Sequence, residues 1–405
     1  MRRDSNSPKL KVLFIHTATY TPLGAGPWVH SLIMRNLDRT EVEVHAAVSP
    51  GSDTTPAPLF GILRQTADLE IHRVDLGPES LRDGLARAGR HPIAAVNSLC
   101  RALSSFTRLY FVVRRDKIDI IHTDERPRDA FVSVLLGKMT GAKVIVHLHV
   151  AFGEWMSPLL RWSLPRADLL LCVSEFVRKS HIHEDRDPAR VRTVLNSIDI
   201  PQWTPRLNRD EMRRQLQLEP DAPVIITACR LGEGKGVLDL VRAISEVRAA
   251  SPDVKLIIAG QGDQQFTAQM VDLIGQLDLT GSVTLLGWRS DVPALMAAAD
   301  IFAMPSRGEP CALAYIESMA MELPVVALND GGAPEVIQNG TTGLLSDPGD
   351  AQTLADNLRS LLIDDGLAVA FGRAGREHVK NHHDGPRLGA DVLEVYRDLL
   401  SREAL

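Results

Sequence analysis

Two carboxylates eight positions apart, Glu309 and Glu317, stand in the stretch GEPCALAYIESMA. Pro310 is expected to be the first residue of a helix, where its missing N–H removes no hydrogen bond. Residues 311–314 then present free backbone N–H groups, which form an anion site at a helix N-terminus. Glu309 precedes this helix and Glu317 lies about two turns further on. Because carboxylates accept strongly from hydroxyl groups, the pattern predicts a nucleotide-sugar, with a diphosphate between two hydroxyl-bearing rings.

Two cations occupy a glycine-rich turn in the stretch ACRLGEGKGVLDL. Arg230 follows an apolar run that is typical of a strand, and Lys235 lies where the next helix begins. Cations at the carboxyl end of a strand can stabilise the charge that develops on a departing diphosphate. The GxxxxGK[ST] spacing of a P-loop is absent. A surface turn with solvated charges is the alternative interpretation.

Other strand ends carry residues that suit a binding site. Gly260 and Gly262 in IIAGQGD allow a ligand to approach closely, although an ordinary tight turn has the same pattern. A loop with Gly24 and Gly26 leads from the first strand into a helix and is longer than the usual two to six residues. His149 ends the run KVIVHLH and is expected to face the ligand, unless it is a satisfied core histidine.

Short apolar runs separated by amphipathic stretches position these residues. Most runs are apolar at successive positions, which is typical of parallel strands covered on both faces. The pattern predicts an α/β protein with two doubly wound lobes that face each other across a cleft, with ligands beyond the carboxyl ends of the strands. The expected strands are 11–15, 42–48, 70–74, 118–122, 143–149, 168–173, 191–195, 223–228, 254–259, 282–286, 300–304 and 324–327.

Length and composition agree with two globular domains in a reducing compartment. The 405 residues exceed one ordinary core and suit two domains of roughly 200 residues. A segment with Pro201 and Pro205 separates the two patterns. The four cysteines form no CxxC pair, which favours a cytoplasmic protein without a zinc site. No apolar run approaches the roughly 20 residues that span a bilayer, and the N-terminus lacks an apolar signal core.

Charge is divided unevenly along the chain. Residues 1–200 carry 27 Lys+Arg and 22 Asp+Glu (+5), and residues 201–405 carry 18 and 29 (−11), which sums to −6. A basic first half suits an anionic acceptor or a membrane surface, and chance asymmetry is the alternative. Within it, the segment 87–117 holds seven basic residues and one acid. Its basic face is expected either to contact anionic lipid headgroups or an anionic acceptor, or to be solvated.

Helical spacing in this basic segment separates an apolar face from a basic one. The apolar residues that are expected to face the core are Leu99, Leu103, Phe106, Tyr110 and Val113. The basic residues that share another face are Arg101, Arg108 and Arg115.

Taken together, EPCALAYIE, RLGEGKG, GWRSDVPALMAAADIFAMPS and DGGAPEVIQNGTTGLL resemble the signature of the retaining glycosyltransferases of family four, which have the GT-B fold. The resemblance implies transfer of a sugar from a nucleotide-diphosphate-sugar to a hydroxyl of a glycan, lipid-linked or small-molecule acceptor. It implies retention at the anomeric carbon, with no metal and no other cofactor. Residues 1–200 would bind the acceptor, residues 201–385 the donor, and a helix over 386–405 would pack back toward the first lobe.

The resemblance also assigns roles to single residues. Arg230 and Lys235 would hold the diphosphate, Glu309 the sugar hydroxyls and Glu317 the ribose. His149 would lie close to the transferred sugar. The remaining donor-side positions are the amides of Leu313 and Ala314 at the phosphate, Gly287, Trp288 and Arg289 beside the base, and the loop of Gly24 and Gly26 in the first lobe.

Two other functions are compatible with this fold. A nucleotide-sugar epimerase would isomerise the donor without an acceptor, so incubation with donor alone distinguishes it. A non-catalytic binding protein would release no nucleotide with any acceptor. A dinucleotide-dependent oxidoreductase is disfavoured because the first strand is not followed by GxGxxG. No nucleic-acid partner is expected.

Overall fold

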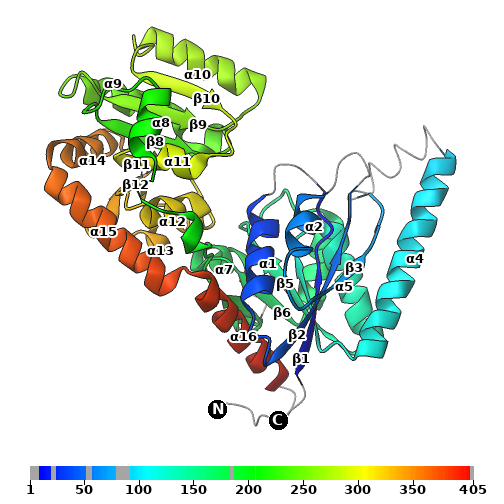
Figure 1. Ribbon diagram of the computed structural model, residues 1–405. Coiled ribbons are helices and arrows are strands. Elements are labelled where there is room, and N and C mark those ends of the chain that lie inside the picture. The colour runs from blue at the N-terminus through cyan, green and yellow to red at the C-terminus, as the bar shows by residue number, and fades with distance from the viewer. Residues whose placement is uncertain are drawn as a thin grey trace. The chain divides into compact units, whose positions relative to one another are not determined.

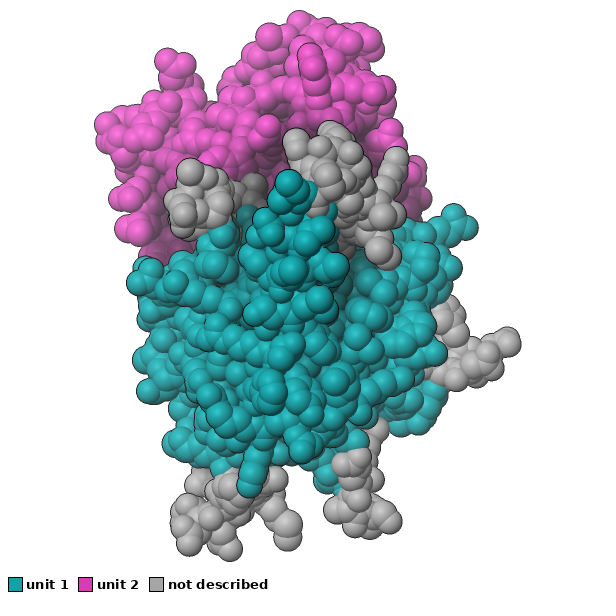
Figure 2. Space-filling view, turned by 90° about the vertical axis from the view of Figure 1, so that its right-hand side faces the viewer, with its two compact units in different colours: residues 1–195, 385–405 teal, residues 196–384 magenta. Residues whose placement is uncertain are grey.

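Two parallel α/β sheets organise the chain, each within its own compact unit (Figure 2). The first unit comprises residues 1–195 and 385–405, and the second comprises residues 196–384. The computed structural model describes residues 9–19, 24–51, 57–78, 92–182, 187–205 and 207–401. The N-terminal lead, part of the loop before Gly24, the start of the basic segment and the last four residues lie outside this description.

The sheet of the first unit has seven described strands in the order β3-β2-β1-β4-β5-β6-β7. All pairings are parallel. Every residue of β4 and β6 is buried, and β6 is apolar throughout, as expected of a parallel strand covered on both faces. The strands are β1 (Leu10–Ile15), β2 (Val42–Val48), β3 (Leu69–Arg73), β4 (Ile120–Asp124), β5 (Lys143–Leu148), β6 (Leu169–Cys172) and β7 (Val191–Thr193).

Helices connect and cover these strands, and the last helix of the chain belongs to the same unit (Figure 1). Helix α16 packs against α1, where a Cβ on Gly389 would lie 2.2 Å from the Asn36 carbonyl oxygen. Its Tyr396 is fully buried and its hydroxyl lies 2.6 Å from His122 Nδ1. The described helices are α1 (Ala25–Asn36), α2 (Pro58–Leu63), α4 (Pro92–Asp116), α5 (Pro127–Thr140), α6 (Pro158–Ser163), α7 (Glu175–His181) and α16 (Gly385–Ser401).

The sheet of the second unit has six described strands in the order β10-β9-β8-β11-β12-β13, again all parallel. Strand β13 was not predicted, because its four residues follow a run of Gly and Thr and are only half covered. The strands are β8 (Val224–Ala228), β9 (Lys255–Ala259), β10 (Val283–Gly287), β11 (Ile301–Met304), β12 (Val325–Leu328) and β13 (Gly343–Ser346).

Amphipathic helices bury one face against this second sheet. Leu240, Val241 and Ile244 of α9 join Leu358 of α14 in a core with strand residues such as Ile258. The helices are α8 (Arg209–Gln215), α9 (Val237–Arg248), α10 (Gln264–Gln276), α11 (Val292–Ala297), α12 (Leu313–Ala320), α13 (Ala333–Val336), α14 (Ala351–Ile363) and α15 (Asp365–His382).

Each sheet reverses its strand order once, between β1 and β4 in the first unit and between β8 and β11 in the second. Connections on the two sides of such a point run in opposite directions, so a crevice forms beyond the carboxyl ends of the two strands. Residues that follow β8 and β11 therefore lie at the natural ligand position of the second unit.

Helix α4 differs from the prediction in how much of its apolar face it buries. Leu109 and Val113 pack in the core, with Phe106 and Tyr110 partly buried beside them. Leu99 and Leu103, which were predicted to be core residues, are 61% and 59% exposed. The reason is length, because 25 helical residues extend about 37 Å, further than a five- to seven-residue strand at about 3.3 Å per residue. Among the described helices, none is long and apolar enough to cross a bilayer.

The chain passes between the units twice, after Leu195 and after Asp384. The two passages are bonded to each other. Ile198 N–H donates to the His383 carbonyl at 3.0 Å, and Ile198 forms a parallel bridge with Asp384. The Asn196 carbonyl lies 2.8 Å from His383 Nδ1. The first passage, after Leu195, lies slightly before the border between the lobes that the sequence predicted at residue 200.

Candidate active site

Lys235 and Glu309, which are 74 positions apart in sequence, form an ion pair at the strand reversal of the second unit. Lys235 ends the turn after β8, and Glu309 follows β11. Ser306 Oγ lies 2.8 Å from the Glu309 carboxylate oxygen that the ammonium contacts. Glu309 is only 8% exposed, whereas the Lys235 side chain is 28% exposed. The site therefore holds a nearly buried carboxylate whose cationic partner still reaches solvent.

Gly236 allows the turn after β8 to approach β11. Its φ is +66°, and a Cβ there would lie 1.9 Å from the Pro305 carbonyl oxygen. Two further contacts hold the same junction, because Arg307 N–H donates to the Gly234 carbonyl at 2.9 Å and Ser306 Oγ lies 3.0 Å from that oxygen. The glycine-rich sequence thus positions Lys235 against Glu309.

A second turn fixes the backbone of Glu309. Its carbonyl accepts from Gly332 N–H at 2.7 Å, and Gly308 N–H donates to Asp330 Oδ2 at 2.7 Å. Gly331 has a φ of +63°, and a Cβ there would lie 2.6 Å from the Glu309 nitrogen. The DGG motif is part of the family resemblance, but no role was predicted for Asp330 or Ser306. The available signal was an acid directly before two glycines.

Helix α12 begins at Leu313, so the prediction that Pro310 is its first residue is wrong. Ala312 has extended backbone, with φ −67° and ψ 121°. The Cys311 carbonyl accepts from Asn196 Nδ2 at 3.0 Å, so a side chain takes the acceptor that a longer helix would use. Ala312 offers no capping side chain. The N–H groups of Leu313 and Ala314 therefore stand in the uncapped first turn.

Glu317 and Arg230 take no part in the described ion pair of Lys235 and Glu309. Glu317 is partly exposed on α12, and burial raises the pKa of its carboxyl to about 7. Arg230 is exposed just after β8. The described side-chain contacts of Glu309 are with Lys235 and Ser306 rather than with either of these residues.

The loops after β8, β9 and β10 lie against one another. A Cβ on Gly260 would lie 1.8 Å from the Cys229 carbonyl oxygen, and one on Gly262 would lie 2.9 Å from Leu231 Cβ. These two glycines are thus required by loop packing. Gly260 N–H donates to the Gly287 carbonyl at 2.8 Å.

The predicted base-side residues follow β10. Gly287 has a φ of +66°, and Trp288 is 55% exposed. Arg289 Nε donates to Asp291 at 2.7 Å. The indole of Trp288 is therefore exposed, and the neighbouring Arg289 is already paired with Asp291.

In the first unit, His149 follows β5 and lies against the start of α1. Gly24 caps α1 and Gly26 is its second residue. A Cβ on Gly26 would lie 3.4 Å from His149 Cδ2. The His149 N–H donates to Glu125 Oε2 at 3.0 Å, but neither ring nitrogen has a hydrogen-bond partner among the described residues. His149 is therefore not the satisfied core histidine of the alternative interpretation.

Comparisons with known proteins identify this architecture. Residues 24–202 match the family Glycosyltransferase Family 4, and residues 208–378 match Glycosyl transferases group 1. The chain therefore belongs to the family four glycosyltransferases of GT-B fold, which confirms the resemblance seen in the sequence. It is a glycosyltransferase that takes its sugar from a nucleotide-sugar donor.

Relatives of different specificity share this similarity. Alpha-maltose-1-phosphate synthase of Mycolicibacterium smegmatis is 32% identical, over 84% of this chain and 93% of that protein. GDP-mannose-dependent monoacylated alpha-(1-6)-phosphatidylinositol monomannoside mannosyltransferase of Corynebacterium glutamicum is 30% identical, over 70% and 77%. The structure of Anabaena Alr3699/HepE with UDP-glucose has a TM-score of 0.76 at 20% identity, over 96% and 100%, and supports the fold alone.

Proposed function

We propose that the protein transfers the sugar with retention at the anomeric carbon and without a metal, using Arg230, Lys235 and Glu309 of the second unit and His149 of the first. The Lys235–Glu309 ion pair at the strand reversal carries this proposal. An ammonium has three donors, so Lys235 can bind a diphosphate oxygen while it keeps Glu309. Glu309 has further acceptor positions for the hydroxyls of the transferred sugar.

Cleavage of the bond between the sugar and the diphosphate builds negative charge on the diphosphate and positive charge on the sugar. Lys235, exposed Arg230 and the first-turn N–H groups of α12 stabilise the former. The acceptor hydroxyl attacks from the face that the diphosphate leaves, and a donor phosphate oxygen takes its proton. A cysteine nucleophile is not required, and burial raises the pKa of the neighbouring Cys311 thiol to about 12, so that this thiol stays protonated.

Substitution of the two cations tests this chemistry. Arg230→Ala and Lys235→Ala should each lower kcat by about a hundredfold, the scale of losing one preorganised charge stabiliser. Arg242→Ala is the matched control, because Arg242 forms an exposed ion pair with Asp239 on α9. Initial rates with a saturating donor give kcat. Near-normal turnover in either cation variant would refute its role.

The donor is identified by thermal stabilisation. A nucleotide-sugar that binds only the folded state stabilises it by about 2.7 kcal/mol at 100 times its Kd. UDP-, GDP- and ADP-sugars should be compared, and the transferred sugar identified by product analysis with candidate acceptors. Retention is read from the anomeric configuration of the product by NMR. An inverted product, or transfer that EDTA abolishes, would contradict the proposed mechanism.

We also propose that α4 contacts an anionic membrane surface, which favours a lipid-linked acceptor. Beyond its core contacts, α4 carries exposed apolar side chains, and exposed arginines lie on the face away from the core. Apolar residues flanked by cations bind the interface of an anionic bilayer. The exposed apolar residues are Ile93, Val96, Leu99, Leu103 and Phe111.

Sedimentation with liposomes tests this contact. The wild type should sediment with vesicles that contain anionic phosphatidylglycerol and should remain in the supernatant with neutral vesicles. The double variant Leu103→Ser/Phe111→Ser should lose most of the bound fraction. Val271→Ser is the control, because Val271 is an exposed apolar residue of α10 at 52%. Equal sedimentation of the wild type and the α4 variant would exclude this surface.

A further inference from the structure

Five histidines gather inside the first unit, and the proposed transfer chemistry uses only one of them. They follow β1, lie on α1, in β4 and in β5, and follow β5. Their rings contact one another, with centroids 4.4 Å apart for His147 and His149 and 5.2 Å apart for His30 and His147. The five are His16, His30, His122, His147 and His149.

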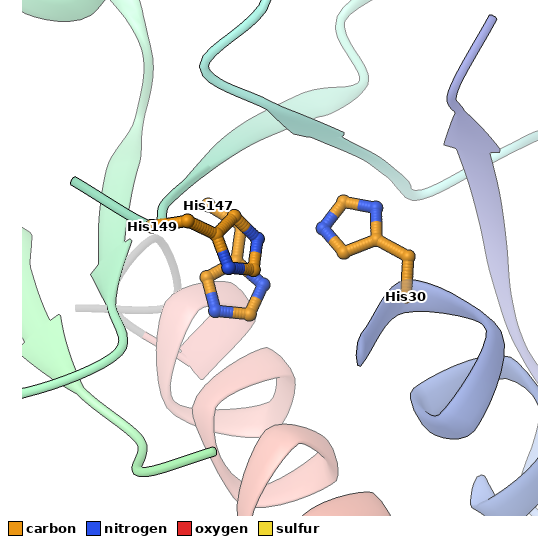
Figure 3. Close-up of side chains that lie close together, drawn as sticks. All are labelled: His30, His147 and His149. Carbon is orange, nitrogen blue, oxygen red and sulfur yellow. The ribbon is translucent and has the colours of Figure 1, made fainter. Parts of the chain in front are cut away.

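Three of these imidazoles turn ring nitrogens toward a common position (Figure 3). One ligand nitrogen from each of His30, His147 and His149 lies within 4.8 Å of the other two. Figure 3 shows His30 on α1 facing the pair from the end of β5. Among the described residues, no hydrogen-bond partner reaches Nε2 of His30 or either ring nitrogen of His147 and His149. Buried polar atoms are normally satisfied, and a ligand at this common position would satisfy this set of exceptions.

His16 and Asp124 lie on the outer side of His30. The Nδ1 atoms of His16 and His30 lie 3.3 Å apart, and His16 Nδ1 also lies 3.2 Å from Asp124 Oδ2. A metal on His30 Nε2 requires the tautomer in which His30 Nδ1–H donates to His16. Such an outer partner on the second nitrogen is typical of histidines that bind metals.

A second histidine cluster shows what a satisfied arrangement looks like. His45, Glu70 and His72 also place ligand atoms close together. There, however, His45 Nδ1 lies 3.1 Å from His72 Nε2, and His45 Nε2 lies 3.0 Å from Glu43. The imidazoles of this cluster already have partners, so it requires no ion and serves as an internal control.

We propose that His30, His147 and His149 form a binding site for a Zn²⁺-class transition-metal ion, and that the bound ion inhibits sugar transfer by holding His149. Three imidazoles with a fourth position open to water are a zinc ligand set, whereas Mg²⁺ prefers oxygen ligands. Zn–N bonds are about 2.0–2.1 Å long, so binding would bring the three nitrogens closer together than they are now. Rotation of the imidazole side chains would provide this movement. The inhibition rests on the proposed role of His149, but the binding does not.

Metal titration of the full-length protein tests the site directly. After treatment with EDTA and its removal, Zn²⁺ should bind with a stoichiometry of one by calorimetry, and Co²⁺ should give the visible absorption of a tetrahedral site. His147→Gln and His30→Gln should each weaken Zn²⁺ binding by at least about tenfold, while His45→Gln should bind as the wild type does. Thermal melts of each variant establish that it is folded.

The outcomes separate the two halves of the proposal. Unchanged Zn²⁺ affinity in both folded variants, or its loss in His45→Gln, overturns the site. Activity is then measured with and without Zn²⁺, and the ratio should fall in the wild type but not in His147→Gln. Binding without inhibition overturns the role of His149 and leaves the site intact. Absence of transfer with every donor contradicts the proposed function, and the titrations still report on the site.

Discussion

At the scale of single residues, the active centre is organised around a charge pair that neutralises itself before the donor binds. A carboxylate as buried as Glu309 would be costly alone, and the Lys235 ammonium and the Ser306 hydroxyl compensate for its lost hydration. In the proposed function, the same ammonium also donates to the donor diphosphate while it keeps Glu309. We therefore expect Lys235→Ala to leave Glu309 without its cation and to weaken both donor binding and turnover.

The family resemblance assigns Glu317 to the ribose of the donor, and in that role it makes donor binding depend on pH. Its folded-state pKa of about 7 lies above the usual 4.5, so the carboxylate forms only as the pH rises through about 7. One pH unit below that value, about a tenth of the molecules carry the carboxylate. The donor Kd from calorimetry should therefore rise severalfold between about pH 8 and about pH 6, and Glu317→Gln should bind weakly at both.

The same group gives stability the opposite pH dependence. The folded state holds this proton more tightly than the unfolded chain, so its contribution to the free energy of unfolding is present at low pH and is lost between about 4.5 and about 7. Denaturant titrations should show the wild type losing stability relative to Glu317→Gln across that window. Parallel pH profiles of the two proteins would contradict the assigned pKa.

The positions of Lys235 and Glu309 were predictable, whereas their supports were not. Both residues follow apolar runs, and the carboxyl ends of parallel strands share one edge of a sheet. Ser306 and Asp330 also follow apolar runs, and Asp330 precedes two glycines, but short polar residues are so common after strands that position alone gives them no role. His149 packs against rings from α1 and β5, and neither of its ring nitrogens has a hydrogen-bond partner among the described residues. No local sequence pattern shows these surroundings.

At the scale of elements, the strands were predicted best because continuous burial leaves a continuous apolar run. Helix boundaries and faces were predicted less well. The start of α12 depends on Asn196, more than a hundred positions away. How many residues of the apolar face of α4 are buried depends on how far the helix extends past its sheet, and periodicity alone does not predict this.

The packing of α16 against α1 should be sensitive to a single added carbon atom at Gly389. Gly389→Ala places a Cβ 2.2 Å from the Asn36 carbonyl oxygen, and overpacking of this kind costs about 1–3 kcal/mol. Gly275→Ala in α10 is the control, because nothing lies within 4 Å of its Cβ position and alanine favours a helix by about 1 kcal/mol. Denaturant unfolding should show opposite signs for the two. A neutral Gly389→Ala would mean that α16 moves away freely.

At the scale of the whole molecule, the two units differ in whether their sequence is continuous. Residues 196–384 contain a complete sheet with its helices, so this fragment should unfold cooperatively on its own. Residues 1–195 lack α16, which buries Leu388, Val392 and Tyr396 at roughly 1.5–3 kcal/mol each. That loss approaches the total stability of a domain, so this fragment should show no cooperative melt by circular dichroism. Linking residues 385–401 to its end should restore one.

The paired passages near Ile198 and His383 have a mechanical consequence. The two backbone segments are joined by their own hydrogen bonds, and both connect the units. A single proteolytic nick in either passage leaves the halves linked covalently by the other. Release of the nucleotide-binding fragment therefore requires two cuts.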